Sequence, residues 1–220
     1  MKNIGWMGLL CVSLLVGCGG GSDGGPASDN AALSVVQISS ALSSMPMESL
    51  NPSETNSLSF MREEEKLALD VYTAMDQLYA GNTRVFSNVA SSEITHIEAV
   101  RLLLDRYSLN DPALGSGAGV FVDQTLQVLY ARLLQSGQSN LSNAFMVGVE
   151  IEELDLHDLQ SELLGVDNQD IRYVYEILMK GSRNHLRSFY KNLLQQGGSY
   201  VPQYIPQADF DAIVNTPTER

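Results

Sequence analysis

The sequence predicts an all-α protein, a bundle of four long helices with a long crossover between the second and the third. Two observations support this prediction. From Leu58 onward, apolar residues recur at helical spacing, and no stretch shows the strict apolar–polar alternation of a half-buried strand. The periodic segments are also unevenly spaced, because a long connection separates the second from the third. Such a connection lets these two helices run parallel instead of alternating up and down.

The expected helices follow from this periodicity and from the residues that flank it. They span roughly Leu58–Tyr79, Thr83–Tyr107, Leu141–Leu164 and Asn168–Gln196, with a shorter helix near Thr125–Gln135 inside the long connection. The segment "YVPQYIPQADFDAIV" is punctuated by prolines, so it predicts a loop that packs back on the bundle and ends in a short helix. Residues 35–56 are rich in Ser, Met and Pro and predict only weak or partial structure.

The first twenty residues, "MKNIGWMGLLCVSLLVGCGG", have the features of a processed leader. One Lys precedes an apolar run that is too short for a stable membrane span, and small residues follow. Residues 15–18, Leu-Val-Gly-Cys, resemble the lipobox of bacterial lipoprotein signal peptides, which implies cleavage before Cys18 and lipidation of its thiol. An ordinary secretory leader with an incidental cysteine is the alternative. We therefore predict a signal peptide over residues 1–17, a flexible lipid-anchored tether over 18–56, and a helical domain over 57–214.

Composition narrows the function classes and the location. With 26 acidic against 13 basic residues, the net charge of −13 argues against nucleic-acid binding, which needs basic surface. The remaining cysteine, Cys11, lies inside the leader, so a mature chain has no disulfide and no thiol chemistry. The expected partner is a membrane, reached through the lipid anchor, and a homo-oligomer stays open. Gly19, where Asp would signal inner-membrane retention, favours the outer membrane of the cell envelope, facing the periplasm or the exterior.

The second and fourth helices carry ionisable residues on faces that are otherwise apolar. In "SSEITHIEAV", Glu93 and His96 share a face with Ile97 and Val100. On the fourth helix, His185 lies within the apolar stripe. Burying such groups costs several kcal/mol unless something pairs with them. Either other side chains or a metal ion must therefore satisfy them.

The third and first helices add carboxylates at a similar depth. On the third, Glu152 lies in an apolar stripe and Asp155 in the gap between two stripes, whereas Glu150, Glu153 and His157 fall on the solvent-like side. On the first, three consecutive glutamates cannot share a face. The helical wheel puts Glu64 at the centre of the stripe, with Glu63 and Glu65 flanking it.

Inward polar groups on every long helix predict a metal site. The candidate ligands are Glu64 or Glu65, Glu93, His96, Glu152, Asp155 and His185. Carboxylates with imidazoles and no thiol suit iron or manganese and are compatible with zinc, as two ions or one. A hydrogen-bonded Glu–His pair without metal is the simpler interpretation of any single helix. The recurrence on four helices favours a cation.

Four segments in order, "MREEEKLALDVY", "SSEITHIEAV", "VGVEIEELDLHDL" and "GSRNHLRSFY", resemble the ferritin-like family called domain of unknown function 2202. The resemblance covers about residues 57–210. It implies a ferritin-like four-helix bundle, related to rubrerythrin and bacterioferritin, and a carboxylate-bridged dimetal site, but no activity.

The ferritin-like motifs that this resemblance implies transfer to most but not all positions. Glu-x-x-His on the second helix is met by Glu93 and His96. Glu-x-x-Ala-x-x-x-Tyr on the first helix is met by Glu65, Ala68 and Tyr72, which differs from the helical wheel's choice of Glu64, so both glutamates stay candidates. The third-helix acid is met by Glu152. A second Glu-x-x-His fails on the fourth helix, because residue 182 is Ser. Either Asp155 replaces the absent carboxylate, or the site holds one ion.

Two functions remain in competition. The first is a lipid-anchored, extracytoplasmic metal-binding protein, with a di-iron or di-manganese oxidoreductase that reacts with dioxygen or peroxide as its enzymatic form. The alternative is a non-enzymatic binding or structural module, whose buried Glu and His groups form salt bridges.

Overall fold

The structure, a computed structural model, describes residues 33–220 and is entirely helical and irregular over that range. The predicted signal peptide and Cys18 lie outside the described residues. The helices are α1 (Val35–Ser44), α2 (Pro52–Tyr79), α3 (Val85–Arg106), α4 (Gln124–Gly137), α5 (Leu141–Glu162), α6 (Gln169–Gln195) and α7 (Gln207–Val214). The all-α prediction is therefore confirmed for this range. Within it, no helix is both long enough and apolar enough to cross a bilayer.

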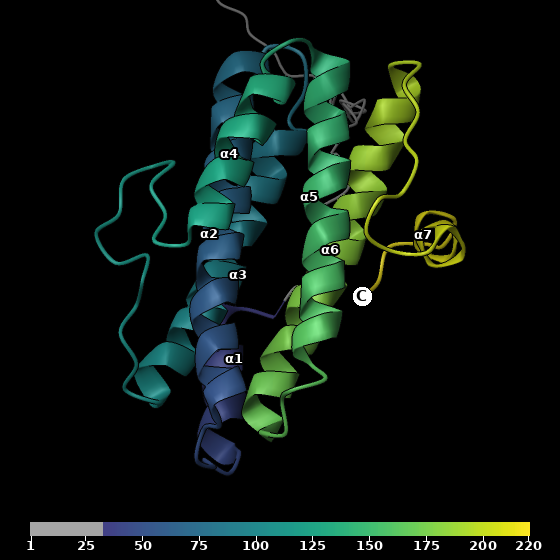
Figure 1. Ribbon diagram of the computed structural model, residues 1–220. Coiled ribbons are helices and arrows are strands. Elements are labelled where there is room, and N and C mark those ends of the chain that lie inside the picture. The colour runs from purple at the N-terminus through teal and green to yellow at the C-terminus, as the bar shows by residue number, and fades with distance from the viewer. Residues whose placement is uncertain (1–32) are drawn as a thin grey trace, which may run out of the picture.

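Four long helices, α2, α3, α5 and α6, pack along one another (Figure 1). The helices α2 and α3 form one hairpin and α5 and α6 the other, each joined by a short loop, and α2 packs on α5 while α3 packs on α6. The crossover from α3 to α5 carries α4, which packs on α2 and α5. The predicted helices agree with the observed ones to within a few residues, except at the N-terminal end.

The prediction of weak structure over residues 35–56 is wrong for two segments. Helix α1 begins with a capping box between Ser34 and Gln37, and it buries Ile38 and Leu42 against the α3 side of the bundle. Helix α2 begins at Pro52, six residues before the predicted Leu58, because Asn51 and Glu54 form a second capping box. The part of the predicted tether from Val35 onward thus belongs largely to the packed helical domain.

Buried apolar side chains form two clusters, one toward each end of the long helices. Each long helix contributes to both clusters, and each carries a polar pair between them. The pairs are Glu64 and Glu65 on α2, Glu93 and His96 on α3, Glu152 and Asp155 on α5, and Ser182 and His185 on α6. A buried polar layer therefore divides the apolar core at one level of the bundle.

Other buried carboxylates hold the connecting segments in place. Glu63 accepts hydrogen bonds from the backbone N–H groups of Val122 (2.5 Å) and Asp123 (2.8 Å), which fixes the crossover at the start of α4. Glu54 likewise accepts from the N–H groups of Asp167 and Asn168, in the loop between α5 and α6. Backbone donors stabilise a buried carboxylate in its charged form.

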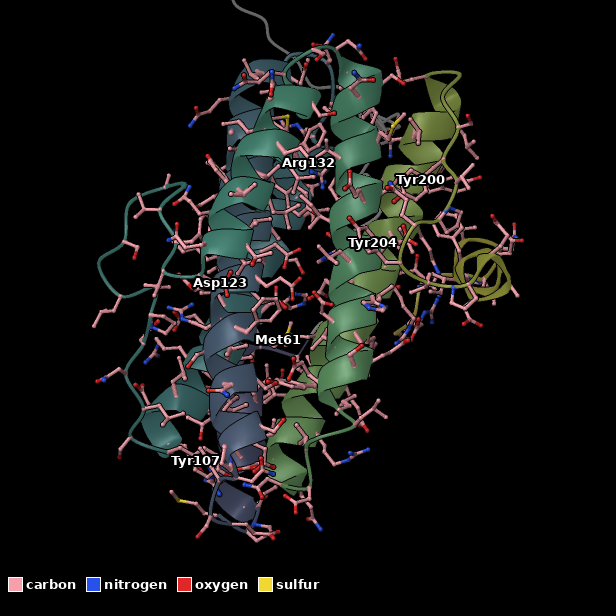
Figure 2. All side chains as sticks on the ribbon, viewed as in Figure 1. Met61, Tyr107, Asp123, Arg132, Tyr200 and Tyr204 are labelled. Carbon is pink, nitrogen blue, oxygen red and sulfur yellow. The ribbon has the colours of Figure 1, made fainter. Side chains whose placement is uncertain are left out.

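The prediction that Glu150 and Glu153 face solvent is wrong. The side chain of Glu153 is fully buried and accepts hydrogen bonds from the Tyr200 hydroxyl (2.6 Å) and from the N–H groups of Gln203, Tyr204 and Ile205. Glu150 is buried beside Arg132 of α4. Figure 2 shows Arg132 on α4, and Tyr200 and Tyr204 on the segment after α6, beside α5. Long connections therefore cover the face that a helical wheel assigns to water.

We predict that Glu153→Ala releases the segment from Tyr200 to Ile205 and lowers the free energy of unfolding by about 3 kcal/mol, since a buried charged acceptor is lost. Glu150→Ala is the matched control on the same helix, with an expected loss of no more than about 1 kcal/mol, because Arg132 is half exposed. Urea denaturation measures both losses, and hydrogen exchange of the Gln203–Ile205 amides reports the release. Equal losses for the two variants would refute this role of Glu153.

Candidate metal centre

The polar layer brings together two imidazoles and several carboxylates from all four long helices. The ring centroids of His96 and His185 lie 5.4 Å apart, although the two residues come from different hairpins. Glu93 lies between them, because its Oε2 is 2.8 Å from Nδ1 of His96 and its Oε1 is 2.9 Å from Nδ1 of His185. These three residues offer ligand atoms that all lie within 4.8 Å of one another. They form the centre of the candidate site.

A second carboxylate approaches each imidazole. Glu65 Oε2, from α2, lies 3.3 Å from Nδ1 of His96, and Glu152 Oε2, from α5, lies 3.4 Å from Nδ1 of His185. The Tyr72 hydroxyl donates to the other oxygen of Glu152 at 2.5 Å. The arrangement is therefore nearly symmetric about Glu93.

Asp155 completes the site from the side of α6. The Ser182 hydroxyl donates to Asp155 Oδ2, while Asp155 Oδ1 is buried without a hydrogen-bond partner. Ser182 occupies the position where the ferritin-like motif would place a fourth-helix acid. The acid at this level thus comes from α5, and the residue at position 182 orients it.

Glu64 and Glu65 are both buried but point to different neighbours. Glu65 faces His96, whereas Glu64 lies next to Asp158 and Asp155 and touches neither imidazole. The first-helix motif Glu-x-x-Ala-x-x-x-Tyr therefore identifies the glutamate that faces a histidine, Glu65, whereas the helical wheel chose its neighbour Glu64. His157 is exposed, as its predicted face requires.

The buried charges of this layer do not balance. The layer holds five carboxyl groups, which carry five negative charges when ionised, and two imidazolium rings offset only two of them; these groups belong to Glu64, Glu65, Glu93, Glu152 and Asp155. No Lys or Arg of residues 33–220 forms an ion pair with these carboxylates. The remaining charge must be removed by protonation or offset by a cation.

The pKa shifts of these groups reflect the same excess of buried negative charge. Burial raises the pKa of Glu65 to about 7, against the opposing pull of His96. Burial, with the nearby charge of Glu65, raises the pKa of Asp155 well above its usual range. Burial alone would lower the pKa of His185, but Glu93 and Glu152 outweigh it and raise that pKa to about 10. Without a cation, the layer thus holds protonated imidazoles next to carboxyl groups that retain protons.

The orientation of the imidazoles fits a cation better than it fits salt bridges. Nδ1 of His96 and Nδ1 of His185 each lie within 3 Å of a Glu93 oxygen, yet neither makes a hydrogen bond of acceptable geometry. Glu65 Oε1 and Asp155 Oδ1 are also buried without partners. These nitrogen and oxygen atoms lie close together but are not aligned for hydrogen bonds. A single ion between them could be coordinated by several of them. The donor set, imidazole and carboxylate, suits iron or manganese.

Comparison with known proteins agrees with the sequence motifs. The family model described as "Uncharacterized protein domain (DUF2202)" matches residues 54–217. The chain belongs to this family. It is 41% identical over 179 residues to the uncharacterized protein MJ0754 of the archaeon Methanocaldococcus jannaschii, an alignment that covers 81% of this chain and 96% of that protein. The crystal structure of MJ0754 superposes with a TM-score of 0.77, at 41% identity, over 80% of this chain and 99% of the other.

Gly181 is a supporting residue that the sequence motifs did not reveal. A Cβ atom added there would lie 2.3 Å from Nε2 of His96, so only glycine lets the imidazole of α3 approach α6 this closely. A Cβ at Gly148 on α5 would press on the ring of Phe189 at 2.5 Å, outside the polar layer. These two helical glycines therefore form a matched pair.

We predict that Gly181→Ala displaces His96 from Glu93 and Glu65, whose charges raise its pKa against the effect of burial. The pKa of His96 should fall toward about 6.5 in chelator-treated protein, as NMR titration of its ring protons measures. Gly148→Ala should leave that titration unchanged, although each variant overpacks the interior by about 1–3 kcal/mol. An unaltered His96 titration in Gly181→Ala would contradict the claim that Gly181 leaves the space that the His96 ring occupies.

Proposed function

We propose that this protein is a ferritin-like metalloprotein that holds two divalent iron or manganese ions in the polar layer between its two apolar clusters. The observation that carries the proposal is the excess of buried carboxylates around two imidazoles that they contact without hydrogen-bonding. Two hairpins of long helices joined by a crossover support the ferritin-like assignment.

The donor atoms divide into two sets. Glu65 and His96 would hold one ion, Glu152 and His185 the other, and Glu93 would lie between them, since its two oxygens face different imidazoles. Asp155, oriented by Ser182, would supply the acid that the fourth helix lacks. These four carboxylates then offset two divalent ions. Burial and the nearby charge of Asp155 raise the pKa of Glu64 well above its usual range, so Glu64 would stay protonated and the layer becomes neutral.

Iron or manganese bound here supplies one-electron chemistry toward dioxygen or peroxide, which makes an oxidoreductase the enzymatic form of the proposal. The protein's own part is to fix and shield the ligands. Tyr72 holds Glu152 by one oxygen and leaves the other directed at His185. The apolar clusters above and below the layer exclude water, which strengthens every charge interaction inside it. Zinc would fill the same donors without redox chemistry.

The competing function is a helical module whose Glu and His groups form salt bridges only. The raised pKa of His185, which burial opposes and Glu93 and Glu152 cause, favours this reading of the metal-free protein. The two functions make opposite predictions for metal content and for pH dependence.

We predict that the purified protein binds two Mn²⁺ or Fe²⁺ ions per chain, and that Glu65→Gln weakens this binding by at least about a hundredfold, because loss of a residue that only positions a metal ligand already costs about 10- to 100-fold. Glu64→Gln is the adjacent control. It is equally buried and undergoes the same exchange of carboxyl for amide, but it faces away from the imidazoles, so less than about a threefold loss is expected.

Elemental analysis and isothermal titration measure both quantities. A wild-type chain that takes up no ion would refute the proposal. Equal losses for Glu64→Gln and Glu65→Gln would refute the ligand assignment.

We predict that the stability lost in His185→Gln depends on pH in opposite ways with and without metal. In chelated protein, the folded pKa is raised to about 10, so the His185 contribution is complete below about 6.5 and declines as pH rises toward 10. In loaded protein, protons compete with metal for the imidazole, so the loss grows with pH.

Thermal melts at about pH 5.5 and about pH 7.5, on either side of the unfolded imidazole value, distinguish these trends. The loss should be larger at the higher pH with metal and at the lower pH after chelation. A loss that ignores the chelator and is always greatest at the lower pH would support the salt-bridge module.

We also propose that the chain is anchored by a lipid at Cys18 and faces the periplasm or exterior of the cell envelope. The lipobox-like residues before Cys18 support this location. Cys18→Ser should abolish both labelling with a radioactive fatty acid and cleavage before residue 18, while the helical domain keeps its circular dichroism spectrum. A labelled and cleaved Cys18→Ser protein would exclude the anchor.

A further inference from the structure

A pocket with both polar and apolar walls opens between α3 and α6 and reaches the two imidazoles of the proposed metal centre. It encloses about 680 Å³, and both His96 and His185 belong to its lining. This volume lies within the range of about 300–1,000 Å³ that small-molecule sites occupy. A diatomic oxidant needs no space of this size. The pocket is therefore large enough for a small organic molecule beside the centre.

The walls of the pocket offer hydrogen bonds and one uncompensated charge. Hydroxyl and amide groups line it, among them Ser92, Thr95 and Ser188. Lys180 also lines the pocket, is half-buried, and forms no ion pair within the described residues 33–220. The pocket's single carboxylate, Glu219, is bound at the rim by Arg183 and Arg187, so its charge is already offset.

The charge beneath the pocket decides how much Lys180 matters. In the proposed centre, four carboxylates offset two divalent ions, so the layer under the pocket is neutral. Among the pocket-lining residues in the range 33–220, Lys180 is then the charged side chain that no other side chain offsets. In a chain with a net charge of −13, a hollow that presents a cation is selective for anions.

We propose that the pocket between α3 and α6 binds a small organic anion, with its acid group at Lys180 and its remainder over His96 and His185. This inference deepens the proposed function and rests on it, since it assigns a substrate class to the same metal centre. The hydroxyl groups of Ser92, Thr95 and Ser188 select molecules that carry further polar atoms.

The test uses Mn²⁺-loaded protein with benzoate as the anionic probe and benzamide as its neutral analogue of similar shape. Bound Mn²⁺ relaxes the NMR signals of nearby probe protons, so the relaxation rate reports binding close to the centre. Benzoate should be relaxed at least fivefold more than benzamide. In Lys180→Gln, the Kd of benzoate should rise about tenfold, as expected when one charge-assisted hydrogen bond is lost.

Two further variants keep the outcome unambiguous. Lys191→Gln removes an exposed lysine elsewhere on α6 and should leave benzoate binding unchanged. Ser188→Phe fills the pocket and should abolish the relaxation of both probes while the Mn²⁺ content stays the same.

The failures of the two proposals are distinguishable by the metal content, which is measured first. Full Mn²⁺ loading with equal relaxation of benzoate and benzamide, or with no effect of Lys180→Gln, would overturn the anion pocket and leave the metal centre standing. Absence of bound Mn²⁺ would overturn the proposed function and, with it, the charge balance that makes the pocket select anions.

Discussion

The cost of burying a carboxylate organises this molecule. An ionised carboxylate loses several kcal/mol of hydration when it enters an apolar interior, and it persists there only with donors or a cation nearby. Glu54, Glu63 and Glu153 satisfy this requirement with backbone N–H groups, and the price of their burial is offset by fixing a loop. The carboxylates of the polar layer have no such donors in sufficient number. The same constraint thus produces two kinds of buried carboxylate, one that holds connecting segments in place and one that is left without enough hydrogen-bond donors.

The position of the polar layer follows from the helix faces and sets its chemistry. Apolar residues lie on both sides of it along each long helix, so the candidate ligands lie between two apolar clusters, where electrostatic interactions are much stronger than in water. Between α3 and α6 the layer is bordered instead by the pocket, and Gly181 leaves the space for His96 to approach α6. The centre is thus enclosed along the bundle axis and approachable from one side.

The sequence was sufficient to predict which residues are buried where a helix face packs only on the other long helices. The periodic faces of α3 and α6 placed Glu93, His96 and His185 correctly, because those faces pack on neighbouring long helices. The wheel failed for Glu150 and Glu153, because α4 and the segment after α6 cover that side of α5, and a wheel contains no information about connections. It also chose Glu64 over Glu65, a difference of one residue that only the packing partners resolve. Helix α1 escaped prediction because two buried side chains, Ile38 and Leu42, suffice to dock so short a segment.

The three consecutive glutamates of α2 point in three directions. Glu63 reaches the crossover, Glu64 reaches the α5 side at Asp158, and Glu65 reaches His96 on α3. Each added residue turns a helix by about 100°. A single insertion or deletion before this run would therefore rotate all three carboxylates away from their present partners. Substitution at one position damages one contact, whereas a shift of frame damages all three at once. Length changes should therefore be rare within α2 among natural relatives.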